Sequence, residues 1–122
     1  MPKVMISYRP HVASLDGAAN RLADQIPKIV ADALTCANPQ GHLVPEDVEV
    51  EVKAISSGFR TKYSLLVEVE ANDYPERRKT LEQRTHQILC AIRIFLNGED
   101  WHRFGFKGWV WVKLFTAYWG EV

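Results

Sequence analysis

The chain has 122 residues, of which 47% are hydrophobic and 25% are charged, with 15 Lys and Arg residues against 15 Asp and Glu residues. This length and composition predict one globular domain over residues 1–122 and argue against a disordered chain. A formal net charge of zero excludes a broad electrostatic attraction to nucleic acid or to an anionic membrane, so an anionic ligand would need a few local cations.

The first predicted element is a strand over residues 4–8, where apolar side chains alternate with others. Ser14 can cap a helix over residues 15–34, whose apolar residues recur at spacings of three and four. Pro27 lies inside this pattern, and a proline in a helix interior removes one backbone hydrogen bond. We therefore expect a kink or two helical pieces there. Residues 38–41, NPQG, predict the turn that closes the helix.

Two more strands follow, with a loop between them. Residues 46–55 read EDVEVEVKAI, which places valines on one face of a strand and charged side chains on the other. After a loop over residues 56–62, residues 63–71 read YSLLVEVEA and predict a strand whose apolar face carries Leu65, Val67 and Val69.

A second helix is predicted after this strand. Asn72 or Asp73 can cap it, Pro75 suits its first turn, and an Asn-Gly pair at positions 97 and 98 ends it. Its buried stripe consists of Leu81, Ile88, Leu89, Ile92 and Phe95. The last predicted strand is WVWVKLF, residues 109–115, which is apolar on both faces except for a lysine.

The order strand-helix-strand occurs twice, so residues 2–55 and 62–117 form a pseudo-repeat. In this repeat VEVK, residues 50–53, lies over VWVK, residues 110–113. Two βαβ units with right-handed crossovers predict an α+β fold, in which a four-stranded sheet carries two helices on one face.

The other face of this sheet would be bare. Glutamates at alternate positions of two strands predict that much of it is wet, whereas Trp109, Trp111 and Phe115 predict that part of it is covered. A monomer with one bare sheet face cannot easily hide so many large aromatic side chains. We therefore expect an oligomer, in which subunit packing is favoured over ligand contact for these residues and for Trp119.

Several stretches resemble the tautomerase superfamily: the Met1-Pro2 start that leads directly into a strand, the helix after it, and VEVEVKAI. GFRTKYSLLVEVE through YPERRKTLEQRTHQI resembles especially the 5-carboxymethyl-2-hydroxymuconate isomerase-like branch. The architectural likeness covers nearly the whole chain. It implies a tautomerase-like fold, a homotrimer and a cofactor-independent keto-enol tautomerase or isomerase acting on a small carboxylate, a 2-oxo or 2-hydroxy-dienoic acid.

The chemistry that this resemblance implies depends on Pro2. Removal of Met1 would leave a secondary amine, and a free α-amino group titrates near ~8. Desolvation or a nearby cation lowers that pKa toward neutrality, where the nitrogen can act as a general base. It would take a proton from the carbon alpha to a carbonyl and return it elsewhere on the conjugated system. The developing enolate needs a cation or hydrogen-bond donor. If Met1 stays attached, the Pro2 nitrogen is an amide and has no basicity.

The resemblance also implies substrate-binding residues. Alignment on VWVK places Lys113 in the pocket, where it would hold a carboxylate or enolate, and Trp111, which would form an apolar wall. Lys113 could equally extend from the strand to solvent. Arg60 and Lys62 are secondary candidates, because analogous loops lie near the pocket of a neighbouring subunit.

This chain departs from the family in its arginines. Many relatives carry an arginine in the loop just after a first-type strand, whereas here Arg9 comes early and Arg77 and Arg78 come late, on the helix. Another family arginine position, in the second strand, holds Glu49, with Trp109 as its counterpart in the second half. A non-catalytic protein of the same fold therefore remains an alternative. A ferredoxin-like βαββαβ binding module is another, because it shares the element order.

Other residue classes predict no further site. No apolar run approaches the ~20 residues of a bilayer span and the start lacks the apolar centre of a signal peptide, so we expect a cytoplasmic protein without membrane contact. Cys36 and Cys90 lack C-x-x-C spacing, and buried free thiols are expected. The basic run ERRK predicts a solvated helix face in preference to nucleic-acid contact. The histidines, which show no metal spacing, are His11, His42, His86 and His102.

Overall fold

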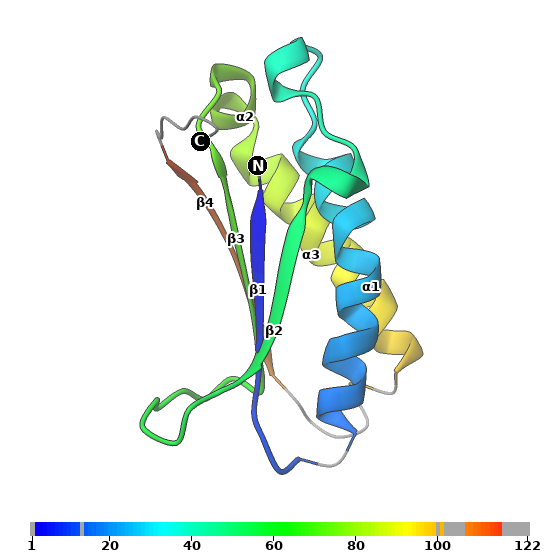
Figure 1. Ribbon diagram of the computed structural model, residues 1–122, viewed down its shortest axis with the longest axis vertical. Helices are drawn as coiled ribbons and strands as arrows, with labels where there is room; N and C mark the ends of the chain where they lie inside the picture. The colour runs from blue at the N-terminus through cyan, green and yellow to red at the C-terminus, as the bar shows by residue number, and fades with distance from the viewer. Residues whose placement is uncertain (1, 13, 100, 102–106, 116–122) are drawn as a thin grey trace, which may run out of the picture.

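The computed structural model describes residues 2–12, 14–99, 101 and 107–115, which form one mixed sheet of four strands with helices on one of its faces (Figure 1). The strands are β1 (Lys3–Tyr8), β2 (Glu49–Ala54), β3 (Leu65–Asn72) and β4 (Gly108–Phe115), in the order β2-β1-β3-β4. β1 pairs with β2 in parallel, β3 pairs with β4 in parallel, and the central pair β1 and β3 is antiparallel. Each half of the chain thus supplies one parallel pair.

The helices connect the strands of each parallel pair. α1 (Leu15–Leu34) lies between β1 and β2 in the chain, followed by two short 3-10 helices, η1 (Pro39–Gly41) and η2 (Pro45–Asp47). α2 (Pro75–Lys79) and α3 (Leu81–Gly98) lie between β3 and β4. This arrangement confirms the predicted α+β fold. It excludes the ferredoxin-like alternative, because in that fold another strand splits each βαβ unit, whereas here β1 hydrogen-bonds directly to β2.

The core lies between the sheet and the helices and follows the period-2 pattern of the strands. Alternate residues of the central strands have no exposed surface, and they pack against the apolar stripes of α1 and α3. Burying one such side chain contributes about 1.5–3 kcal/mol to the free energy of unfolding. The members of this cluster with no exposed surface are Val4, Ile6, Val67, Val69, Ala71, Leu22, Ile26, Val30, Leu34 and Ile88.

The start of α1 and its interior differ from the sequence prediction. α1 is one continuous helix through Pro27, so of the two expectations the division into two helical pieces is wrong. Proline removes a single backbone donor, and the packing of Leu22, Ile26 and Val30 on both sides of it holds the helix together. Ser14 does precede the helix, but its φ of 67° is left-handed and its side chain makes no capping hydrogen bond.

The second predicted helix is divided in two at Thr80, whose backbone is not helical (φ −119°, ψ 23°). The Thr80 hydroxyl donates to the Glu76 carbonyl at 3.0 Å and accepts from Arg84 Nε at 2.7 Å, so its polar groups are satisfied at the break. The residue that precedes α2 is Tyr74, and the Asp73 carboxylate binds the Arg78 guanidinium instead of capping the helix.

Candidate functional site

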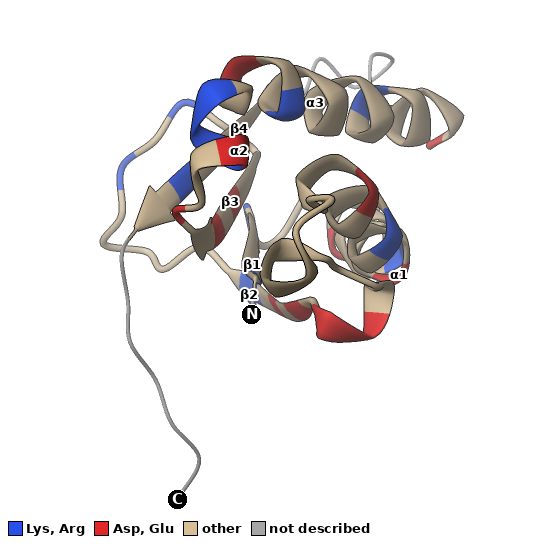
Figure 2. Ribbon diagram, turned by 90° about the horizontal axis from the view of Figure 1, so that it is seen from above, with Lys and Arg blue, Asp and Glu red and all other residues tan. Residues whose placement is uncertain are grey.

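Pro2 is buried beside the starting ends of β1 and β2. It directly precedes β1, and its carbonyl oxygen accepts a hydrogen bond from the Glu49 amide at 3.0 Å. Proline has no backbone N–H, and it suits the position just before a strand because no hydrogen bond of the sheet needs a donor there. The start of β1 lies at the same end of the sheet as α2 (Figure 1), and this end faces the viewer in Figure 2.

Pro2 lines a cavity of about 180 Å³ between the loop that follows α1 and the segment that joins β3 to α2. Its walls combine polar and apolar groups. The side chains among them that can carry a charge near neutral pH are His42, Asp47 and Arg77. The other lining residues are Gln40, Leu43, Asn72 and Tyr74.

Arg77 is the buried cation of this cavity, with a relative exposure of 2%. Its guanidinium donates to three carbonyl oxygens, those of Leu34 at 2.7 Å, Gly41 at 3.1 Å and Asn72 at 3.2 Å. The guanidinium carbon also lies 4.9 Å from the centre of the Tyr74 ring. No carboxylate among the described residues pairs with Arg77, so carbonyl dipoles, including one at the C-terminus of α1, stabilise its charge. Burial lowers the pKa of Arg77, and an arginine still stays protonated near neutral pH.

The loop after α1 packs tightly under Arg77. The Gly41 carbonyl accepts from the Cys36 amide at 2.9 Å as well as from Arg77. A Cβ on Gly41 would lie 2.8 Å from Cys36 Cβ and 3.3 Å from the Tyr74 ring, which is too close for any other residue. Cys36 is 3% exposed, and burial raises the pKa of its thiol. These contacts fix the floor of the cavity beside Pro2.

The other titratable groups of the cavity are held by local contacts. Asp47 Oδ2 accepts from the Val44 amide at 3.0 Å, and His42 Nδ1 lies 3.3 Å from Thr35 Oγ1. Within the described part of the chain, no group of three or more His, Cys, Asp or Glu side chains gathers in a way that could hold a metal ion.

The structure places Lys113 and Trp111 on the sheet face that no helix covers. Their register partners on β3 are Glu70 and Glu68, and the Lys113 ammonium lies 6.0 Å from the centre of the Trp111 ring. Both side chains are exposed, and neither lines the Pro2 cavity. The parity of the strand explains this, because alternate positions of β4 face away from the helices.

Arg60 and Lys62 lie at the opposite end of the sheet. They belong to the loop between β2 and β3, which hangs below the sheet in Figure 1, and they line a shallow hollow with Arg9 and Phe59. Within one chain the structure therefore brings none of the four predicted substrate-binding residues to Pro2.

Arg77 is the cavity residue that the sequence prediction left aside. The position of Arg77 could have been found from topology alone. β3 runs antiparallel to β1, so the segment that follows β3 must begin beside Pro2. Arg77 follows the end of β3 closely, on the first turn of α2.

One solved structure supports this architecture. A macrophage migration inhibitory factor-like protein from Entamoeba histolytica superposes with a TM-score of 0.57 at 13% identity, covering 99% of this chain and 95% of that chain. The fold is tautomerase-like. A macrophage migration inhibitory factor homologue from Prochlorococcus marinus superposes with a TM-score of 0.47 at 11% identity, covering 98% and 95%.

The sequence comparisons add no closer assignment. No protein-family model matches the chain. No curated protein matches it either. The structural likeness therefore shows the fold, and the narrower resemblance to the 5-carboxymethyl-2-hydroxymuconate isomerase-like branch has no support from it. No helix in the described part of the chain is long and apolar enough to cross a bilayer.

Proposed function

We propose that this chain is a cofactor-independent tautomerase that isomerises a small 2-oxo or 2-hydroxy-dienoic acid, with the Pro2 nitrogen as general base. The observation that carries this proposal is the burial of Pro2 in a cavity that also contains Arg77, within a tautomerase-like fold. The proposal requires that Met1 is removed, because an amide nitrogen cannot accept the proton.

Two features of the cavity support a basic nitrogen at Pro2. Burial disfavours the protonated form of an amine, and so does a cation in the same cavity. Pro2 is buried, and Arg77 keeps its charge without a carboxylate partner among the described residues. From these two effects we expect a free Pro2 amine to lose its proton more readily than an ordinary α-amino group, which titrates near ~8.

The reaction that follows is a proton transfer within the substrate. The neutral amine takes a proton from the carbon alpha to the substrate carbonyl, and the electron pair of that bond moves to the carbonyl oxygen as an enolate. The protonated amine then returns the proton to the oxygen or to a distant carbon of the conjugated system. No redox step occurs and no co-reactant is consumed.

The enolate and the substrate carboxylate need hydrogen-bond donors. A guanidinium has five N–H bonds, and Arg77, which lines the cavity, makes three donor contacts to carbonyl oxygens. In our proposal its remaining N–H bonds serve the substrate oxygens. In the homotrimer that we propose, Arg60 and Lys62 of one subunit approach the cavity of the next, and Lys113 and Trp111 contribute from the sheet face.

The open sheet face supports the assembly. Trp109 and Trp111 are 48% and 52% exposed on it. One row across the four strands reads Glu49, Lys3, Glu70 and Lys113, so opposite charges alternate. A face with exposed aromatic rings and alternating charges suits a contact with a second copy of itself.

Enol-to-keto conversion of phenylpyruvate or 2-hydroxymuconate tests the proposal. The first measurement is the mass of the mature N-terminus, which must lack Met1. Pro2→Ala is then expected to lower kcat/KM by about tenfold to 100-fold, because an alanine keeps an amine but loses the rigid ring. Pro10→Ala, a proline change in the loop after β1, serves as the control. Equal rates for the native protein and Pro2→Ala would refute the assigned base.

A non-catalytic protein of the same fold is the second candidate. The observation that favours it is the capture of Arg77 by three carbonyl oxygens, together with the distance of the other predicted residues from Pro2 within one chain. Quantitative retention of Met1 in cells would favour this candidate, because it removes the basic nitrogen.

A further inference from the structure

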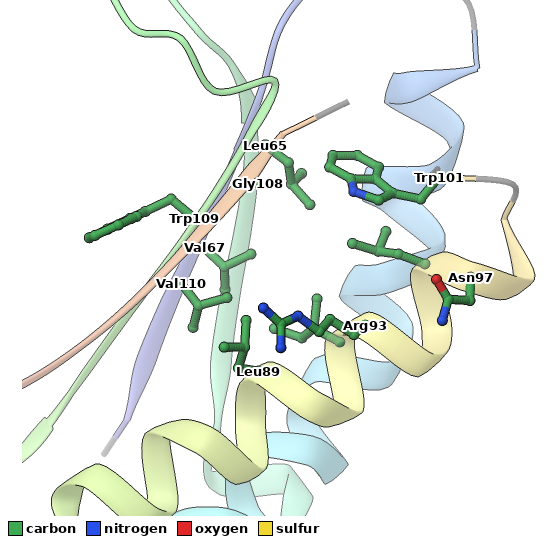
Figure 3. Close-up of a pocket in the computed structure, with 11 residues that line it drawn as sticks. Leu65, Val67, Leu89, Arg93, Asn97, Trp101, Gly108, Trp109 and Val110 are labelled. Atoms are coloured by element: carbon green, nitrogen blue, oxygen red, sulfur yellow. The ribbon is translucent and has the colours of Figure 1, made fainter. Parts of the chain in front are cut away.

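A second cavity, of about 210 Å³, lies between α3 and the strands β3 and β4 (Figure 3). It is formed by the second half of α3 and by the first residues of the two strands, whereas the Pro2 cavity is formed near α2 and the last residues of β3. The two cavities share no lining residue. Any ligand of the second cavity would therefore bind away from Pro2.

The walls of this cavity are mainly aliphatic. Leu65 and Val67 are buried on β3, Ile92 and Leu96 are buried on α3, and Val110 of β4 is half-buried. Water binds weakly to such walls, so an apolar ligand displaces it at little cost in free energy. The ligand then gains van der Waals contacts with the walls.

Trp101 closes one end of the cavity. It is 8% exposed, and its ring packs over Gly108, where a Cβ would lie 3.3 Å from Trp101 Cζ2. Gly108 thus lets the indole approach the start of β4. The indole of Trp109, in contrast, points away from the cavity in Figure 3, toward the open sheet face.

Arg93 supplies a charge at the rim. Its side chain points from α3 toward the strands in Figure 3, and it makes no hydrogen bond or ion pair with any other described residue. Asn97 follows one helical turn later and lines the same cavity, so the two polar side chains lie on one face of α3. Glu99, the acidic residue at the end of α3, is paired with Arg21 of α1.

A cation that pairs with no described residue, beside an aliphatic cavity, defines the chemistry of a ligand. A cavity of about 150 Å³ lined by aliphatic and aromatic side chains accommodates benzene. The larger volume here therefore accommodates one six-membered ring with a short chain. An anionic end would meet the Arg93 guanidinium and the Asn97 amide, which donate well to a carboxylate.

We propose that this cavity is a binding site for a small monocarboxylate with a compact apolar body, such as an arylalkanoate. The ring enters among Leu89, Ile92 and Val110, and the carboxylate accepts hydrogen bonds from Arg93 and Asn97. This site is separate from the proposed reaction at Pro2, so its existence does not depend on catalysis.

The probe is 3-phenylpropionate, and the matched neutral control is 3-phenylpropionamide, both titrated into the full chain and followed by two-dimensional amide NMR. The acid is expected to bind saturably and to shift the amide signals of α3 and the start of β4. The amide is expected to bind about tenfold more weakly, because it loses the charge-assisted hydrogen bonds. Raising the salt concentration is expected to narrow this difference.

Two variants and one control identify the site. Arg93→Gln is expected to reduce the affinity for the acid about tenfold, to that of the amide, while Lys79→Gln, an exposed helical lysine outside the cavity, leaves it unchanged. Val110→Phe is expected to fill the cavity and abolish binding of both probes. The melting temperature of this variant, compared with that of the native protein, shows whether it is folded.

Three outcomes would overturn the proposal. One is equal affinity for the acid and the amide, and another is an Arg93→Gln variant that binds the acid as the native protein does. The third is a set of shifts confined to the Pro2 cavity, which would assign the acid to the proposed reaction site. Repeating the titration with Pro2→Ala separates the two sites, because binding at α3 is expected to be unchanged whether or not the chain has tautomerase activity.

Discussion

Arg77 stabilises the fold because it joins three segments of the chain. Its three carbonyl partners lie at the end of α1, in the loop after it and at the end of β3. Arg77→Met keeps the length of the side chain but leaves these buried acceptors without a donor. We expect it to lower the free energy of unfolding by about 2–4 kcal/mol. Urea unfolding followed by circular dichroism measures this change.

The neighbouring Arg78 provides the control for this measurement. It is exposed and pairs with Asp73 at the surface, so Arg78→Met is expected to change the free energy of unfolding by at most about 1 kcal/mol. Equal losses in the two variants would contradict the structural role assigned to Arg77.

Cys36 makes stability depend on alkaline pH. Burial raises the pKa of its thiol above the ordinary value of 9.0, so the folded chain keeps the proton at pH values where the unfolded chain loses it. The contribution of Cys36 is therefore complete below pH 9.0 and is lost as the pH rises through the higher pKa of the folded state. We expect the free energy of unfolding to fall above that pH.

Cysteine variants test this dependence. Cys36→Ala is expected to flatten the alkaline decline, whereas Cys90→Ala, which changes a free and partly exposed thiol, is expected to retain it. Guanidinium unfolding at several pH values gives both curves. An identical decline in native protein and Cys36→Ala would assign the effect to other groups.

At the scale of single residues the sequence predicted Pro2 as the candidate general base, and in the structure Pro2 is buried and lines a cavity. The sequence also predicted buried free thiols: both cysteines are free, and Cys36 is buried whereas Cys90 is partly exposed. Arg77 was not chosen, because periodicity alone marks a basic helix start as solvated. Only the antiparallel pairing of β1 and β3, a long-range contact, turns that arginine inward.

At the scale of single helices and strands, Pro27 in α1 is a position where a substitution is expected to increase stability. It interrupts the hydrogen bonding of α1 without ending the helix. Pro27→Ala restores the missing donor, and we expect it to raise the free energy of unfolding by about 1–2 kcal/mol after allowance for the greater freedom of the unfolded chain. Thermal unfolding monitored by calorimetry measures the gain.

A proline at a favourable position is the matched control. Pro45 begins η2, where its missing donor costs nothing, so Pro45→Ala is expected to give no gain or a small loss. If both variants gained equally, the stabilisation would come from the unfolded chain in general and would not report on α1.

Strand positions and helix existence were predictable because alternating and helical apolar patterns are local. The details that failed depend on tertiary contacts. Packing on both sides of Pro27 overrides its local preference, and the Thr80 hydrogen bonds divide a pattern that reads as one helix. The same reasoning explains Lys113: its strand was predicted, but the face that it occupies in the assembled sheet relative to Pro2 was not.

At the scale of the whole molecule, the proposed homotrimer can be measured directly. Sedimentation is expected to give three times the mass of the chain. Trp111→Glu places a charge at an exposed aromatic position of the open sheet face and is expected to shift the population toward monomer. Salt titration should show whether the alternating charges of that face add to the association.

An exposed aliphatic residue on the helical layer is the control for this prediction. Ile94 is 75% exposed on α3, so Ile94→Glu changes the same kind of surface away from the open sheet face. We expect it to leave the sedimentation coefficient unchanged. A native protein that sediments as a monomer, or a Trp111→Glu variant that stays associated, would contradict the assembly through this face.

The central position of β1 has a consequence for the timescale on which Pro2 can move. β1 is hydrogen-bonded on both sides, and Val4 and Ile6 have no exposed surface. Amide protons in such a strand exchange with solvent only through the largest opening of a domain. Pro2 directly precedes this strand, so we expect its ring to be anchored to a segment that opens late and to stay in place when the surrounding loops fluctuate.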